Sequence, residues 1–177
     1  MATWTIDTAH SAIEFKVKYL LISTVAGAFT RFDARLDAEN EDFSDAKISF
    51  VAEVASITTN NKERDLHLKS EDFFAADLYP RMTFRSTSFQ KLNETDYKLI
   101  GELTIRNHTR LIDLEVEYGG KVRDVQGGNR AGFEIVGKIS RKEFGLLWDA
   151  VTETGGIVVA DEVKLFFSVQ MVESQLP

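Results

Sequence analysis

Three histidines are the residues of this 177-residue chain that are best suited to metal binding or acid–base chemistry. His10, His67 and His108 each lie in a polar stretch near an aspartate or a threonine, and Asp65 precedes His67 by two positions. No two histidines have the spacing of a helical metal site, and neither H-E-x-x-H nor H-x-H occurs. We therefore predict no metal site and expect each histidine to form a structural hydrogen bond in a turn. A metal site that includes Asp65 is the alternative.

Nucleophilic catalysis has little support in the sequence. The chain has no cysteine, which excludes a thiolate nucleophile and a disulfide, and G-x-S-x-G does not occur. The glycine-rich stretch 126–129 lacks the spacing of a phosphate-binding loop and is typical of a hairpin connection. We predict no catalytic residue and no cofactor. A Ser–His–Asp site assembled from Ser11, His10 and a distant acid stays open as an alternative.

The overall composition narrows the class of protein. With 21 basic and 28 acidic residues, the net charge of −7 disfavours nucleic acid and anionic membrane surfaces as main partners. No apolar run is long enough for a transmembrane helix. The sequence starts directly in a patterned strand at Trp4 without a signal peptide, which favours the cytoplasm; if Met1 replaces a removed signal, the periplasm is the alternative. The length predicts one domain, residues 1–177.

Apolar residues alternate with polar ones at a period of two through most of the chain, which predicts half-buried β-strands. Short polar turns separate these stretches, so we expect mostly antiparallel pairing. About eight strands in one antiparallel sheet close into a barrel or split into a sandwich. The expected strands cover residues 13–21, 29–36, 48–57, 82–89, 97–105, 112–118, 131–139 and 163–171, after a short opening strand at 4–6. Gly27 is expected to mark a bend or bulge.

Two segments break the period of two and predict short helices. In residues 60–74, Asn60 is expected to cap a helix with Glu63 in a capping box, and Ser70 to cap a second turn. Residues 141–148 follow a second expected capping box, Ser140 with Glu143. We expect the first segment to cover one barrel opening with the apolar side chains Leu66, Phe73 and Phe74.

The order and spacing of several short motifs resemble the YceI-like family of lipocalin-like, polyisoprenoid-binding proteins over nearly the whole chain. The motifs are W-x-I-D-x-x-H-S from Trp4, Ser23–Phe29, R-D-x-H-L from Arg64, D-F-F from Asp72, Tyr79-Pro80, G-x-L-T-I from Gly101, R-x-x-F-G from Arg141, and Asp161-Glu162-Val163. The resemblance implies an extended eight-stranded antiparallel lipocalin-like barrel with an apolar cavity. It also implies an isoprenoid ligand, such as an isoprenoid quinone or polyprenyl compound, and a homodimer. Tyr19 stands where the family commonly has His, and Asn107 where it commonly has Gly; Asn107 is expected to adopt a positive φ.

The predicted ligand-binding residues are the apolar side chains that the alternation directs inward, Tyr19, and the aromatic residues of the two helical segments. They are Phe15, Val17, Tyr19, Phe50, Phe73, Phe74, Phe84, Leu103, Phe133, Ile135, Phe144, Trp148, Phe167 and Val169. A barrel of this size can instead be filled by its own side chains. We expect non-catalytic binding, transport or sequestration of a long apolar lipid. The alternatives are an enzyme with a His/Asp cluster at the barrel mouth, and a filled barrel that acts as a dimeric interaction module.

Overall fold

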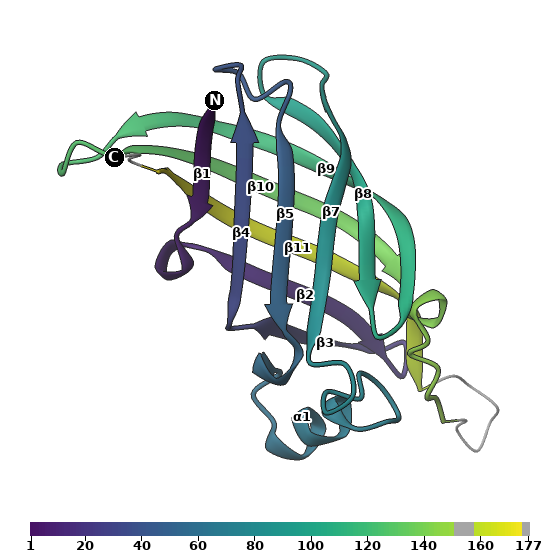
Figure 1. Cartoon of the computed structure of the whole chain (residues 1–177). Helices are drawn as coiled ribbons and strands as arrows, with labels where there is room; N and C mark the ends of the chain where they lie inside the picture. Colours follow the sequence, from purple (N-terminus) through teal and green to yellow (C-terminus); the bar gives the residue numbers. More distant parts are fainter. Residues whose placement is uncertain (151–157, 175–177) are drawn as a thin grey trace.

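The computed structural model describes residues 1–150 and 158–174, which form a strongly twisted antiparallel sheet (Figure 1). Every strand pair in this part of the chain is antiparallel. The strands are β1 (Ala2–Ile6), β2 (Ala12–Tyr19), β3 (Ser23–Phe29), β4 (Phe32–Ala38), β5 (Lys47–Glu53), β6 (Ile57–Thr58), β7 (Arg81–Lys91), β8 (Asp96–Ile105), β9 (His108–Arg123), β10 (Asn129–Ser140) and β11 (Val159–Glu173).

The strands combine into a closed eight-stranded barrel, as predicted. β1 and β2 both pair with β11, and the short 3₁₀ turn η1 (Thr8–His10) separates them. In the same way β3 continues into β4, and β5 continues into β6 after the 3₁₀ turn η2 (Val54–Ser56). The sheet runs from these composite strands through β7, β8, β9 and β10 to β11, and pairing of β1 with β11 closes it. The strand over Ser23–Phe29 was not predicted, because its small residues lack a clear alternation.

The period-two pattern places the apolar side chains inside the barrel. In β8 the alternate residues Tyr97, Leu99, Gly101, Leu103 and Ile105 are buried, and the residues between them are more exposed. The same alternation is seen in β7, β9 and β10. One face of each long strand therefore forms the barrel interior.

Aromatic side chains fill one end of the barrel. Phe43, in the connection between β4 and β5, is buried with its ring 5.3 Å from Trp4, 5.5 Å from Phe133 and 5.6 Å from Tyr118. The Tyr97 hydroxyl donates to the Asp42 carbonyl in the same connection. These contacts fill this end of the barrel.

Gly27 is a site of close packing rather than a bend or bulge. It pairs with Phe15 in unbroken register between β2 and β3. A Cβ at Gly27 would lie 2.3 Å from the Phe15 ring, so the ring lies directly over the glycine. The Phe84 ring likewise covers Gly101, which lies diagonally across the β7–β8 pair.

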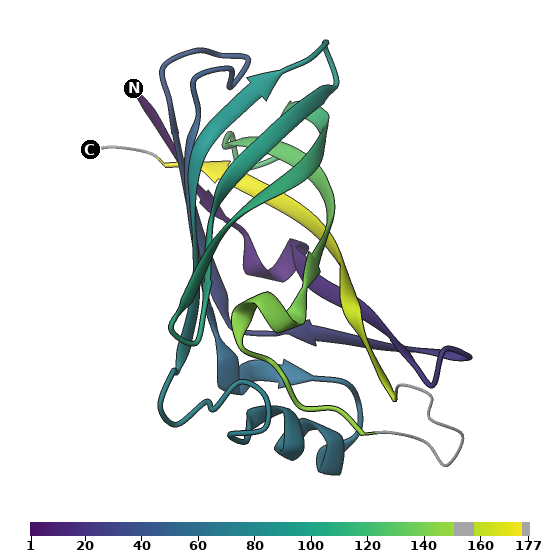
Figure 2. The same ribbon diagram turned by 90° about the vertical axis from the view of Figure 1, so that its right-hand side faces the viewer.

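Helix α1 (Lys62–Lys69) lies at the other end of the barrel, opposite the β4–β5 connection (Figure 2). Asn61, not Asn60, caps it: the Asn61 side chain accepts a hydrogen bond from the Arg64 amide at 3.0 Å. Asn60 has a φ of 60° and precedes the cap, so the predicted box with Glu63 is wrong by one residue. Ser70 is the C-cap, and its hydroxyl donates to the His67 carbonyl. Among the described residues, no helix has the length and apolar composition that crossing a membrane requires.

Two other local predictions are also corrected. The 3₁₀ turn η3 (Arg141–Phe144) follows Ser140, but the Ser140 hydroxyl donates to Asp161 instead of capping the turn. In the two-residue turn between β8 and β9, Arg106 takes the positive φ of 55°, not Asn107. The carbonyl oxygens of Phe73 and Gly145 accept hydrogen bonds from the Arg106 guanidinium at 3.1 Å each, which holds Arg106 in this turn.

Candidate functional site

The hollow end of the barrel encloses a cavity of about 710 Å³. This volume is within the range of roughly 300–1,000 Å³ that is usual for small-molecule sites. Its wall is formed mostly by apolar side chains from the strands, with α1 and the segment after η3 over the open end. The Phe43 cluster forms the floor, because Phe133 belongs to both the cluster and the cavity wall. The barrel is therefore filled at one end and hollow at the other.

Thirteen of the fourteen predicted residues lie at the cavity wall. They are Phe15, Val17, Tyr19, Phe50, Phe73, Phe74, Phe84, Leu103, Phe133, Ile135, Trp148, Phe167 and Val169. Tyr19 stands at the edge of the cavity and is 41% exposed. Contact of these side chains with a ligand stays a prediction.

Phe144, the fourteenth predicted residue, does not line the cavity. Its side chain is fully buried in the core. Phe144 ends η3, which packs against β9 and β11, and the chain then turns at Gly145 with a φ of 78°. This turn directs Trp148, four residues later, to the cavity wall and leaves Phe144 beneath the turn.

Further apolar residues line the cavity without having been predicted as site residues. Those on strands already recognised share the inward register of these strands, so the period-two pattern could have found them. They include Ile48, Met82, Leu99, Ile112, Leu114, Val116, Ile139, Val163, Leu165 and Met171.

Helix α1 faces the cavity with a different side from the one predicted. Leu66 is 67% exposed, whereas Leu68 lines the cavity together with Glu63, Arg64 and His67. Glu63 and His67 are four positions apart, as are Arg64 and Leu68, so the two pairs lie along one side of the helix. Phe73 and Phe74, in the chain after α1, also line the cavity, as expected of a cover.

A network of polar groups lies at this covered end. The Arg64 guanidinium donates from Nε to Thr59 Oγ1 and from Nη2 to the Thr59 carbonyl, both at 2.8 Å. Asp65 Oδ1 accepts from the Thr59 amide at 2.8 Å and from its hydroxyl at 2.5 Å. Thr59 is buried, and the network fixes the Arg64 side chain at the cavity wall. Asp65 thus forms structural hydrogen bonds with Thr59.

The three histidines lie in separate environments. His67 Nε2 is 2.8 Å from Asp72, and its ring packs edge-on against Trp148 and Phe73. His10 pairs with Asp7 in η1 at 2.8 Å, and the His108 ring packs against the backbone of Gly145. Of the three, His67 alone lines the cavity. Within residues 1–150 and 158–174, no group of three potential ligands could hold a metal ion.

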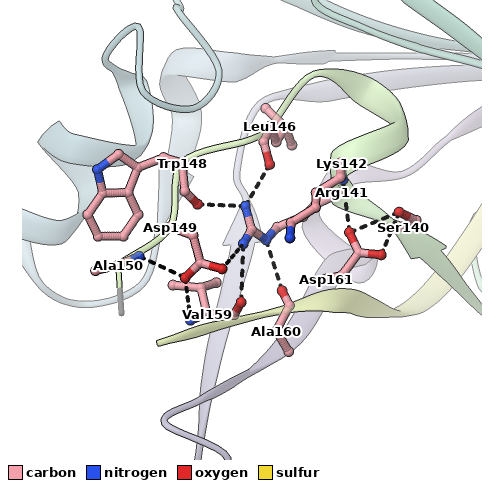
Figure 3. Close-up of polar contacts among 10 residues, drawn as sticks. All are labelled: Ser140, Arg141, Lys142, Leu146, Trp148, Asp149, Ala150, Val159, Ala160 and Asp161. Atoms are coloured by element: carbon pink, nitrogen blue, oxygen red, sulfur yellow. Dashed lines mark hydrogen bonds and ion pairs between the residues drawn. The ribbon is translucent and has the colours of Figure 1, made fainter. Parts of the chain in front are cut away.

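Arg141 fastens the segment that carries Trp148 (Figure 3). Its side chain is 3% exposed, and the carbonyl oxygens of Ala160, Leu146, Trp148 and Val159 accept from its guanidinium at 2.6–3.1 Å. Burial lowers the pKa of Arg141, and the nearby carboxylate of Asp149, at 3.6 Å, opposes this shift. The arginine therefore joins the segment after η3 to the start of β11.

A closed eight-stranded antiparallel barrel with an apolar cavity under a helical cover defines a lipocalin-like class of protein. The family model described as "YceI-like domain" matches residues 4–171, so the chain belongs to the YceI-like family. A UPF0312 protein of Staphylococcus aureus is 35% identical over 99% of this chain and all of its own length.

Solved structures share the same fold. The YceI protein of Campylobacter jejuni is 33% identical, with a TM-score of 0.77 over 89% of this chain and 90% of its own. BcnA of Burkholderia cenocepacia is 24% identical, with a TM-score of 0.81 over 93% and 98% of the two chains. A domain of Saccharophagus degradans, described as polyisoprenoid-binding, is 12% identical, with a TM-score of 0.69 over 95% and 97%.

Proposed function

We propose that this protein binds and carries, or sequesters, a long apolar lipid without changing its bonds. The observation that supports this most directly is the mostly apolar cavity of about 710 Å³. Transfer of a hydrocarbon chain from water into such a space is favourable by about 0.8 kcal/mol per CH₂ group. A five-carbon unit would thus contribute about 4 kcal/mol before the cost of ordering the chain.

An isoprenoid is the lipid class that we favour. The family resemblance supports this choice, as does the fold shared with the polyisoprenoid-binding domain of Saccharophagus degradans. Aromatic and branched side chains such as Phe15, Phe84, Ile135 and Phe167 line the cavity and can pack around methyl branches. An isoprenoid quinone or a polyprenyl compound would fit this wall.

We place the polar end of the ligand beneath α1. Arg64 and His67 line the cavity there, and both can donate hydrogen bonds to a carbonyl or phosphate oxygen. Arg64 is already oriented by Thr59, and His67 by Asp72. The floor around Phe43 and Phe133 offers an apolar end for the opposite terminus of the chain.

Solvent extraction of the purified protein followed by mass spectrometry tests this proposal, and it should release a stoichiometric apolar lipid.

A variant with a narrowed cavity should retain less lipid. Ile139→Trp places a large side chain at the cavity wall of β10, and we expect it to lower retained lipid and geranylgeraniol binding at least about tenfold. Val136→Trp on the exposed face of the same strand is the matched control and should bind like the wild type. If Ile139→Trp does not fold, the smaller change Ala34→Leu at the same wall replaces it.

Two results would contradict the proposal. One is a wild-type protein that releases no lipid and binds neither geranylgeraniol nor a straight-chain alcohol of equal length. The other is equal binding by folded Ile139→Trp and Val136→Trp. Tighter binding of the straight-chain alcohol would keep the carrier function but reject the isoprenoid preference.

A further inference from the structure

The turn between β2 and β3 exposes apolar side chains in an unusual backbone conformation. Leu20 and Leu21 have φ values of 54° and 61°, and the Ile22 amide donates to the Tyr19 carbonyl at 3.3 Å. Two consecutive positive φ values at the centre of a hairpin turn are normally adopted by Asn and Gly, because a branched side chain is strained there. Leu21 is 71% exposed and Ile22 is 85% exposed. Neither local backbone preference nor burial explains these residues at this tip.

Lysines form a row across the outer face beside this hairpin. Lys16 in β2 is directly opposite Lys164 in β11, and Lys164 is directly opposite Lys138 in β10. Like charges in directly opposed positions destabilise a sheet. Lys18, nearer the tip, is also exposed. An anionic partner would relieve the repulsion within this row.

The acidic residues near the row offset only part of its charge. Glu162 pairs with Lys138 at 3.7 Å, and Glu14 is exposed on β2. Among the described residues, Lys16, Lys18 and Lys164 form no ion pair. Asp113, Glu115 and Glu117 are exposed on the adjoining strand β9, beyond Lys138. The strip formed by Lys16, Lys18 and Lys164 on β2 and β11 is therefore the basic part of this face, although the chain as a whole has a net charge of −7.

The same hairpin forms part of the cavity wall. Val17, Tyr19 and Val25 line the cavity from β2 and β3. Figure 2 shows the hairpin projecting outward at the end of the barrel that carries α1. A surface that received the tip would therefore lie close to the cavity's open end.

We propose that the β2–β3 tip and the adjacent lysine row dock the protein on an anionic lipid bilayer. Leu21 and Ile22 would enter the boundary between head groups and acyl chains, and the lysines would attract the negative surface. A bilayer fits this combination of an apolar tip with flanking positive charge. This inference does not depend on a lipid bound in the cavity.

Vesicle flotation of the full chain tests the docking surface directly. The probes are vesicles of phosphatidylcholine alone and vesicles with about 30% phosphatidylglycerol, a fraction that makes the surface strongly anionic. We expect binding to the anionic vesicles that weakens as salt is raised. Leu21→Ser with Ile22→Ser should weaken it about tenfold or more. Lys16→Gln with Lys164→Gln should weaken it roughly 25-fold, or about fivefold per lysine.

Matched variants on other strands control for general changes in apolarity and charge. Leu111→Ser removes an exposed leucine from β9, and Lys47→Gln removes an exposed lysine from β5. Both should bind the anionic vesicles like the wild type. The proposal is overturned if the wild type shows no preference for anionic vesicles, or if the tip and lysine variants bind as well as the controls. It is also overturned if the tip variants change the oligomeric state in solution but not vesicle binding, since the tip would then contact a second copy.

Discussion

At the scale of single residues, the contacts of Arg141 indicate a structural role rather than ligand binding. Four carbonyl oxygens surround its guanidinium, so its donors are largely used within the chain. These carbonyls belong to the segment after η3 and to the start of β11. The R-x-x-F-G motif, recognised in the sequence as a family feature, thus has a physical role: it positions Trp148 at the cavity.

Arg141→Met should lower the free energy of unfolding by about 3 kcal/mol, because several buried carbonyls lose their donor and each such loss costs about 1–3 kcal/mol before relaxation. Urea unfolding followed by circular dichroism measures this. Arg141→Lys should recover only part of the loss, since one ammonium group cannot reach carbonyls on several sides. The exposed neighbour Lys142→Met is the control. A loss below about 0.5 kcal/mol for Arg141→Met would contradict this role.

At the scale of elements, α1 shows where sequence reasoning was weakest. Its apolar residues are few, so the sequence did not show which face is turned inward, and the expectation that Leu66 helps to cover the opening is wrong. Leu66 and Leu68 are two positions apart, so their side chains project about 200° apart around the helix axis and only one of them can face inward. Leu68 therefore faces the cavity and Leu66 faces water.

A pair of leucine variants tests whether α1 acts as the cover of the cavity. Leu68→Ser removes an apolar contact from the inner face, so we expect bound geranylgeraniol to dissociate at least about fivefold faster, as a loss of roughly 1 kcal/mol of apolar contact implies. Leu66→Ser changes the exposed face of the same helix and should leave the rate unchanged. Stopped-flow competition with an excess of unlabelled lipid measures both rates. Equal rates for the two variants would show that α1 does not retain the ligand.

At the scale of the whole molecule, the alternation predicted the strands and their inward faces, whereas the family resemblance favoured a hollow barrel over a sandwich or a filled barrel. A residue's position in the alternation indicates which side of the sheet it occupies, and ten of the thirteen predicted residues at the cavity wall lie on strands. Phe144 was misplaced because the turn at Gly145 depends on contacts with β9 and β11 that are distant in sequence. The filled floor was also missed, since Phe43 lies in a polar loop whose sequence gives no sign that it folds inward.

The ion pairs of Arg130 with Asp7 and Asp124 predict how the stability of the protein changes with acid. Arg130, at the start of β10, donates to Asp7 after β1 at 2.6 Å and to Asp124 at 2.9 Å, so one guanidinium ties the segment after β1 to the β9–β10 hairpin. Hydrogen bonds from Arg130 and then His10 lower the pKa of Asp7 to about 2, and the same arginine lowers the pKa of Asp124. A carboxylate whose pKa is lower in the folded state stabilises the fold above its unfolded pKa, near 4. This stabilisation is lost as the pH falls from about 4 to about 2.

Asp7→Asn should therefore destabilise the protein at pH 7 and make the fall in stability between pH 5 and pH 2 shallower than in the wild type. Urea unfolding midpoints at pH 7, 5, 4, 3 and 2 measure this dependence. Arg130→Gln should flatten the same range at least as much, because Asp7 and Asp124 both lose their charged donor. Adding Asp7→Asn to Arg130→Gln should then change the acid range little, since the two groups act as one unit. Parallel pH profiles for the wild type and Asp7→Asn would show instead that carboxylates elsewhere control acid unfolding and that these ion pairs do not.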